Sequence, residues 1–144
     1  PCQPHGLGEN PALGAVSVPC EENGDVFAIC PDPLRVIATI QTGGRPRSVA
    51  FSGAGARASV ACESGCYVAV IDAGSHKLLS NIKLPTGSLP MGTAVSQNGK
   101  ELYVSTGRGN ALAIIDTEKK KNVTMIPVGN RDWGIELEPS GTKL

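Results

Sequence analysis

A repeat with a period of 42 to 44 residues constrains the fold of this chain more than any other feature of the sequence. The four residues at 48–51 recur at 92–95, which is 44 positions further on, and again at 134–137 after another 42. The dipeptide Ile-Asp at residues 71–72 recurs at residues 115–116, again at an offset of 44. Self-similarity at a fixed period of this length is the signature of a repeat architecture, so one supersecondary unit accounts for most of the chain.

Short strand-like runs fill each repeat. Residues 93–95, 101–105 and 111–115 are small, alternating or apolar runs, a pattern typical of β-strands. Asn98-Gly99 separates the first two runs and favours a tight hairpin, because both central residues of a type I′ turn need positive φ. Four such strands within 42 to 44 residues indicate one blade of a β-propeller. The sequence therefore predicts an all-β fold made of four-stranded antiparallel blades.

Individual motifs within the repeat add a family resemblance. The segments that carry it are PMGTAVS (90–96), NGK (98–100), YVST (103–106), AIIDT (113–117), VIATI (36–40) and IPVG (126–129). In these segments the chain resembles the YVTN family of β-propeller repeats, over about residues 13–144. The family's Asn after Tyr-Val-Thr is replaced by Thr106 in one repeat and by Cys62 in another, and the first repeat has extra residues before Val26.

The repeat divides the chain into five parts. The prediction is an irregular lead-in at residues 1–12, a partial blade at 13–40, complete blades at 47–83 and 91–126, and the first strand of a further blade at 133–144. These parts hold about three blades' worth of strands, and propellers close with four to eight blades. We therefore expect an incomplete propeller as a single chain. Either the chain is part of a longer protein, which the ends within repeats favour, or copies associate into a ring as a homo-oligomer.

Five cysteines give a second set of expectations. Cys20 and Cys30 flank a predicted hairpin, and Cys62 and Cys66 bracket a tight loop, so each pair is a disulfide candidate. Free buried thiols are the alternative. Disulfides persist in oxidising compartments, and the chain looks like a processed piece whose targeting segment has been removed. We therefore expect a periplasmic or extracellular protein.

Composition and missing motifs exclude several classes of function. Lys and Arg together number 13, as do Asp and Glu, and aromatic residues make up 3%, so neither a basic excess nor stacking side chains favour nucleic-acid binding. No apolar run is long enough for a membrane span. His5 and His76 lie far apart, and no haem-attachment or phosphate-loop motif occurs, so no metal or cofactor is predicted.

Asp72 and Asp116 recur once per repeat before turn residues, which favours a role in turns.

The best candidate site is the loop that links the fourth strand of one blade to the first strand of the next. Its three copies read TGGRPRS (42–48), TGSLPMG (86–92) and VGNRDWG (128–134), so the frame persists while individual side chains vary. Variable side chains on a fixed scaffold are how a repeat fold builds a ligand site. Arginine suits carboxylate or phosphate groups, and tryptophan suits stacking. The alternative is that the tryptophan packs between blades and the arginines are solvated. The predicted ligand-binding residues are Arg45, Arg47, Met91, Arg131 and Trp133.

Three functions are consistent with these observations. The preferred one is a non-catalytic binding or scaffold module that uses this loop face to hold a protein or a small anionic ligand, because no catalytic constellation occurs. The family resemblance also implies an alternative, the propeller portion or subunit of a periplasmic redox enzyme similar to methylamine dehydrogenase or to haem d₁ enzymes. A third possibility is a lactonase-like hydrolase, which needs convergent carboxylates and histidines that these loops do not provide.

Overall fold

Three four-stranded antiparallel sheets make up the structure. The computed structural model describes residues 2–138, 140–141 and 143–144, and these contain no helix. The strands of the first sheet are β1 (Gly8–Glu9), β2 (Val16–Cys20), β3 (Asp25–Pro31) and β4 (Leu34–Gln41). Those of the second are β5 (Pro46–Phe51), β6 (Arg57–Cys62), β7 (Tyr67–Asp72) and β8 (Lys77–Lys83). Those of the third are β9 (Thr93–Val95), β10 (Glu101–Ser105), β11 (Ala111–Asp116) and β12 (Lys121–Pro127).

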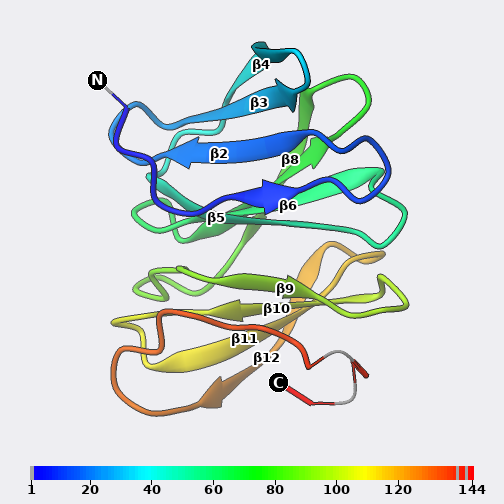
Figure 1. Cartoon of the computed structure of the whole chain (residues 1–144). Coiled ribbons are helices and arrows are strands. Elements are labelled where there is room, and N and C mark those ends of the chain that lie inside the picture. The colour runs from blue at the N-terminus through cyan, green and yellow to red at the C-terminus, as the bar shows by residue number, and fades with distance from the viewer. Residues whose placement is uncertain (1, 139, 142) are drawn as a thin grey trace.

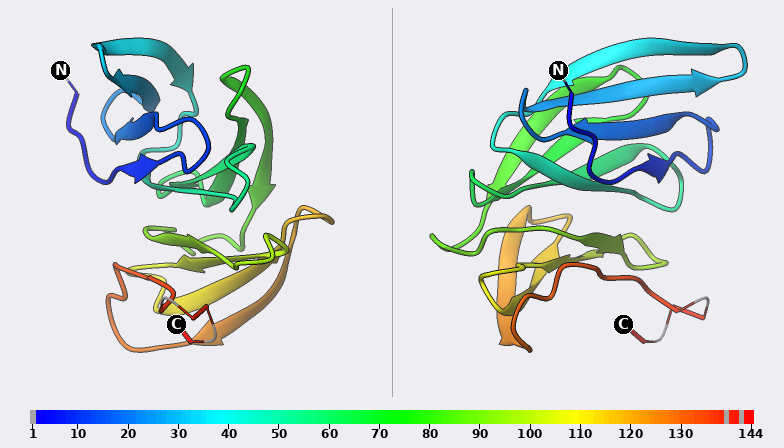
Figure 2. Two further views of the ribbon diagram at one scale, coloured as in Figure 1. Left: turned by 45° about the vertical axis from the view of Figure 1, so that its right-hand side comes forward. Right: turned by 60° about the vertical axis from the view of Figure 1, so that its left-hand side comes forward.

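Each sheet is a meander whose strands lie in chain order (Figure 1). This confirms the predicted all-β class with four-stranded antiparallel sheets. The sheets follow one another along the chain, and their first strands lie next to each other: β5 packs against β1 and β2 on one side and β9 on the other (Figure 2).

The second sheet is buried on both faces. Alternate residues of a strand point to opposite faces, and in β7 both sets are apolar. Ala69 and Ile71 belong to the core shared with the first sheet, whereas Val68 and Val70 belong to the core shared with the third sheet. A strand covered on both sides has no position for a polar residue, which explains why β7 is an almost continuous apolar run.

The lead-in is more regular than the sequence indicated. Gly8 pairs with Ser17, and Glu9 pairs with Val16, so β1 completes a four-stranded first sheet within residues that were predicted to be irregular. The prediction of an irregular segment at 1–12 is wrong at this point. Strand pairing uses backbone groups alone, and a Gly-Glu strand has none of the β-branched side chains by which strands are recognised.

The predicted strand at the other end does not form. Residues 133–138 form no strand, although the Trp133 carbonyl accepts a hydrogen bond of 3.0 Å from Ser105 Oγ and Asp132 forms an isolated bridge with Gly107. A ladder needs a second strand edge beside it. In this fold the first strand of a sheet pairs with the second strand of the same sheet, as β5 does with β6 and β9 with β10, and the described residues after 132 contain no such second strand. The prediction of a first strand within 133–144 is therefore not met.

Both predicted disulfide pairings are wrong. Cys20 is bonded to Cys2, with 5.1 Å between the Cα atoms, and Cys30, Cys62 and Cys66 are free. In the β2–β3 hairpin Cys20 pairs with Asp25, whereas Cys30 lies beyond Ile29 at the opposite end, so the two cysteines of that pair are held apart. Cys62 is buried at the end of β6, and Cys66 lies in the turn that follows.

We expect the three free thiols to differ in reactivity. Burial raises the pKa of Cys62 to about 12, and its side chain is inaccessible, whereas Cys30 and Cys66 are partly exposed. Because the thiolate is the reactive species, iodoacetamide should alkylate Cys30 and Cys66 in the folded protein and Cys62 only after unfolding. Peptide mapping by mass spectrometry without reductant measures both this order and the Cys2–Cys20 link. Alkylation of Cys62 as fast as Cys66, or a Cys62–Cys66 linked peptide, would contradict the structure.

Candidate functional site

The three predicted loops share one backbone conformation. Arg45, Leu89 and Arg131 occupy the same place in successive repeats, and all three have left-handed φ angles, of 62°, 51° and 62°. This conformation is uncommon for residues other than glycine. Its recurrence at one repeat position shows that the fold, and not the individual side chain, sets the course of the loop.

The backbones of neighbouring loops also approach each other closely, at Gly6 beside Arg47 and at Gly92 beside Trp133. A Cβ atom added to Gly6 would lie 2.8 Å from the Arg47 carbonyl oxygen, and one added to Gly92 would lie 2.9 Å from the Trp133 carbonyl oxygen. These glycines allow the backbone of one loop to approach that of the next. The residues beside them are thereby brought to the same end of the neighbouring sheets.

The structure brings all five sequence-predicted site residues together. Arg45, Arg47, Met91, Arg131 and Trp133 line one cavity of about 320 Å³, here called the arginine pocket. His5, Glu63 and Arg108 complete its lining. The exposed fractions differ widely: Met91 is buried at 5%, whereas Trp133 is 54% exposed.

Two glutamates hold the arginines of the pocket in place. Glu63 Oε2 accepts a hydrogen bond of 2.7 Å from Arg47 Nε and lies 3.5 Å from Arg45 Nη1, and Glu63 Oε1 lies 3.0 Å from Arg108 Nη2. Glu21 pairs with Arg47 and, at 3.4 Å, with Arg45. The side chains of Glu63 and Arg47 are only 5% and 11% exposed. Charges that are this well buried need such pairing, because an isolated charge is costly to remove from water.

Two opposing effects set the pKa of Glu63. Burial by itself raises it, but hydrogen bonds from Arg47 and Arg108 and the nearby positive charges lower it by more, so the pKa lies below its ordinary value. Glu63 is therefore ionised throughout the neutral range. Its charge is fixed in the pocket as a partner for the arginines.

Sequence reasoning missed four residues of this cluster: His5, Glu21, Glu63 and Arg108. A signal was present for three of them. His5 precedes Arg47 by 42 residues, so Pro4-His5-Gly6 is a further copy of the loop that continues as Pro90-Met91-Gly92. Glu21 and Glu63 are also separated by 42 residues. Arg108 has no arginine at the corresponding positions of the other repeats, so only the structure identifies it.

The repeated aspartates are turn residues. Asp72 Oδ1 accepts hydrogen bonds of 2.8 Å from Ser75 N and Ser75 Oγ, and Asp116 Oδ1 accepts bonds of 3.0 Å and 2.8 Å from Glu118 N and Lys119 N. Hydrogen bonds from the backbone lower the pKa of both carboxyl groups. Within the part of the chain that the structure describes, no three His, Cys, Asp or Glu side chains gather closely enough to hold a metal ion.

Comparison with known proteins shows similarity at the level of fold. No protein-family model matches the chain, and no curated protein matches it. Among solved structures it is similar to Kuenenia stuttgartiensis Hydrazine Synthase, with a TM-score of 0.89 and 22% sequence identity over 96% of this chain. The match spans 40% of that structure's chain. None of the described residues forms a helix that is long and apolar enough to cross a membrane.

We expect the Glu63→Gln variant to be less stable than the wild type in a pH-dependent way. At neutral pH the free energy of unfolding should fall by about 1–3 kcal/mol, because the change leaves buried arginine donors without a charged partner. A carboxyl group whose pKa is lowered by folding stabilises the protein above its unfolded value of 4.5 and loses this effect as the pH falls toward the folded value. The difference between wild type and variant should therefore narrow in acid.

Urea unfolding from neutral pH down to about pH 3 measures this difference. The control is Glu22→Gln, which removes the same charge from an exposed neighbour of Glu21. Equal losses of stability in the two variants, or a gap that widens in acid, would show that Glu63 does not anchor the pocket.

Proposed function

We propose that the chain is a portion of a β-propeller whose arginine pocket binds a small anionic ligand. The observation that carries this proposal is the convergence of four arginines on one cavity with only two glutamates beside them. The formal charge of these six side chains is positive. A carboxylate or phosphate group would form ion pairs with the arginine donors that Glu21 and Glu63 leave unpaired.

The arginines differ in how much of their hydrogen-bonding capacity remains. Arg47 is committed to both glutamates and is largely buried. Among the described residues Arg108 forms an ion pair with Glu63 alone, and its side chain is 56% exposed, whereas the guanidinium of Arg131 has no ion pair among them. The planar guanidinium presents several donors in a fork that matches carboxylate and phosphate oxygens. Arg108 and Arg131 are therefore the residues we expect to contact the ligand.

Trp133 favours a ligand with a flat or apolar part. Trp133 lines the pocket and is 54% exposed as a residue, so apolar surface is available for stacking. Met91, which is buried on the same cavity, offers a polarizable apolar wall. Stacking on Trp133 together with pairing to Arg131 would fix both the position and the orientation of such a ligand.

Replacement of Arg131 tests the anion site. We expect Arg131→Gln to weaken binding of inorganic phosphate or citrate about tenfold, because a hydrogen bond to a charged group contributes about 1.5–3 kcal/mol. Isothermal titration calorimetry at low ionic strength measures this affinity. Arg35→Gln, which removes an exposed arginine on β4, is the matched control. Equal affinities in the two variants, or no binding by the wild type, would refute the anion site.

The propeller interpretation is supported by the outer faces of the first and third sheets. Phe27 and Ile29 of β3 correspond in the repeat to Ala69 and Ile71 of β7, which are buried against a neighbouring sheet. Leu112 of β11 corresponds in the same way to Val68. Phe27, Ile29 and Leu112 are only half-buried. Further sheets, from the same protein or from another copy, would bury these apolar faces as the second sheet is buried.

A second candidate is a scaffold role within a redox enzyme. The similarity to Hydrazine Synthase over almost the whole chain favours this alternative, and the resemblance to YVTN repeats is consistent with the same architecture. The chain would then position a cofactor or partner that is held elsewhere in the protein. The Cys2–Cys20 disulfide supports a periplasmic or extracellular location, because disulfides persist in oxidising compartments.

A charge placed on an outer face tests whether that face is covered. In the intact protein Leu112→Lys should lower the melting temperature or break the assembly, since it would bury an unpaired charge. Leu34→Lys, on β4, is the control because Leu34 is 81% exposed. Thermal unfolding and light scattering measure stability and mass together. Equal stability and equal mass in the two variants would mean that nothing covers the third sheet.

A further inference from the structure

The two gaps between successive sheets are built from equivalent residues but are filled differently. Asn10, Phe51 and Ala58 line the gap between the first and second sheets, and Ser52, Val95 and Leu102 occupy the same repeat positions in the next gap. The first gap leaves a cavity of only about 20 Å³, whereas the second leaves one of about 360 Å³. We call the second cavity the wedge pocket.

A side chain from each sheet closes the first gap. Phe51 packs its ring against the core between the first and second sheets. Asn10 Nδ2 donates a hydrogen bond of 2.8 Å to the Gly55 carbonyl in the turn between β5 and β6, while Asn10 Oδ1 accepts bonds from Ala12 N and Leu13 N in its own turn. Asn10 is 1% exposed. The Asn10 side chain thus joins the turn after β1 to the turn between β5 and β6 across the gap.

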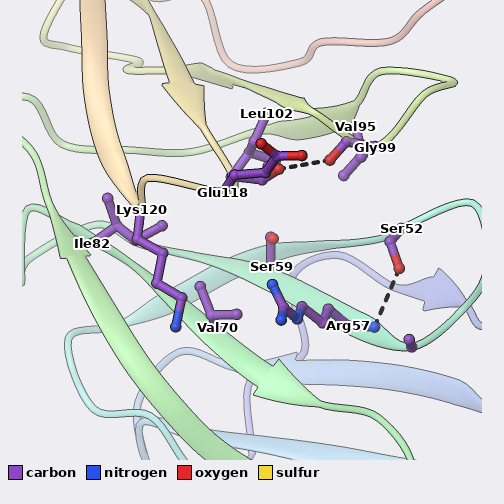
Figure 3. A pocket seen from close by; sticks show the side chains of 12 residues that line it. Ser52, Arg57, Ser59, Val70, Ile82, Val95, Gly99, Leu102, Glu118 and Lys120 are labelled. Carbon is purple, nitrogen blue, oxygen red and sulfur yellow. Dashed lines mark hydrogen bonds between the residues drawn. The ribbon is translucent and has the colours of Figure 1, made fainter.

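The second gap contains neither an equivalent of the Phe51 ring nor an equivalent of the Asn10 hydrogen bond across the gap, among the described residues. Val95 stands where Phe51 stands in the first gap and has no ring to place between the sheets. Ser52 takes the place of Asn10, and its hydroxyl accepts a bond of 3.2 Å from Arg57 N within its own sheet. The sheets therefore remain open at this end, as Figure 3 shows for the residues that line the pocket.

The wedge pocket has an apolar floor and a charged rim. Val70, Ile82 and Leu102 on the floor are each at most 6% exposed and come from both sheets. Arg57 and Lys120 belong to the rim, and in Figure 3 Val70 lies between their charged ends. Glu118 is the single acidic residue of the lining. No salt bridge joins Arg57, Lys120 or Glu118 to another described residue.

We propose that the wedge pocket binds a small aromatic carboxylate. The ring would enter the space that a phenyl ring fills in the equivalent gap, and the carboxylate would pair with Arg57 and Lys120 at the rim. The volume lies within the range of small-molecule sites, about 300–1,000 Å³, and an apolar floor with few charged groups is typical of such sites. This site is separate from the arginine pocket and is independent of the function proposed for it.

The probe for this proposal is 2-naphthoate, with 2-naphthol as the neutral analogue. Calorimetry with the purified protein should show binding of 2-naphthoate, and 2-naphthol should bind about fivefold or more weakly because it lacks the carboxylate. Intermolecular nuclear Overhauser effects should join the naphthalene ring to the methyl groups of Val70 and Leu102. Absence of binding, or contacts to other methyl groups only, would overturn the proposal.

Two variants test the pocket further. Val95→Phe places a ring in the gap, as Phe51 does between the first two sheets, and should reduce affinity for 2-naphthoate at least about tenfold. Val36→Phe adds the same ring at an exposed position on β4 and should leave affinity unchanged.

Arg57→Gln should weaken binding about fivefold without affecting 2-naphthol, and it provides the decisive comparison if Val95→Phe fails to fold. Unchanged affinity in Arg57→Gln, or in a folded Val95→Phe variant, would refute the assignment.

Discussion

Burial of the second sheet on both faces is the constraint on which the rest of the structure depends. The apolar residues of β7 alternate between two cores, so the first and third sheets must pack on opposite sides of the same sheet. That arrangement places the first strands β1, β5 and β9 in a row. The loops that lead into these strands then meet at one end, and this is where the arginine pocket forms.

Within these loops the backbone sets position and the side chain sets chemistry. The left-handed φ angle recurs at Arg45, Leu89 and Arg131 although the side chains differ. Two positions later the repeat offers Arg47, Met91 and Trp133, and all three line the same cavity. A repeat fold can thus change a binding surface one residue at a time, because each loop keeps its course when its side chain changes.

The sequence predicted the sheets and five pocket residues because both follow from the repeat. Apolar alternation and the Asn98-Gly99 turn are local signals, and the offset of 42 to 44 aligns the loops without any knowledge of contacts. What could not be predicted depends on non-local geometry. The Cys2–Cys20 pairing requires the Pro4–Cys20 bridge, which brings the N-terminal residues beside β2.

Other errors had a different origin. β1 was missed because a Gly-Glu strand has no side-chain signature. Glu21 and Glu63 were missed although their separation of 42 residues repeats the offset of the loops, because an acidic residue just after a strand is ordinarily a solvated turn residue and gives no local sign of burial. Arg108 has no arginine at the equivalent positions of the other repeats, so only the structure places it in the cluster, through its 3.0 Å distance from Glu63 and its place in the pocket lining.

The ion pairs of the arginine pocket explain how four arginines can lie close together in a stable structure. Four arginines close together would repel one another, and Glu21 and Glu63 offset that repulsion at the buried end of the cluster. Arg47 is held there in one orientation by two carboxylates, so its position is fixed before any ligand arrives. Arg108 and Arg131 lie at the exposed end, where their charges are less fully paired. In the anion site that we propose, fixing the buried part would lower the entropy lost on binding, and the positive charge left at the mouth would attract the anion.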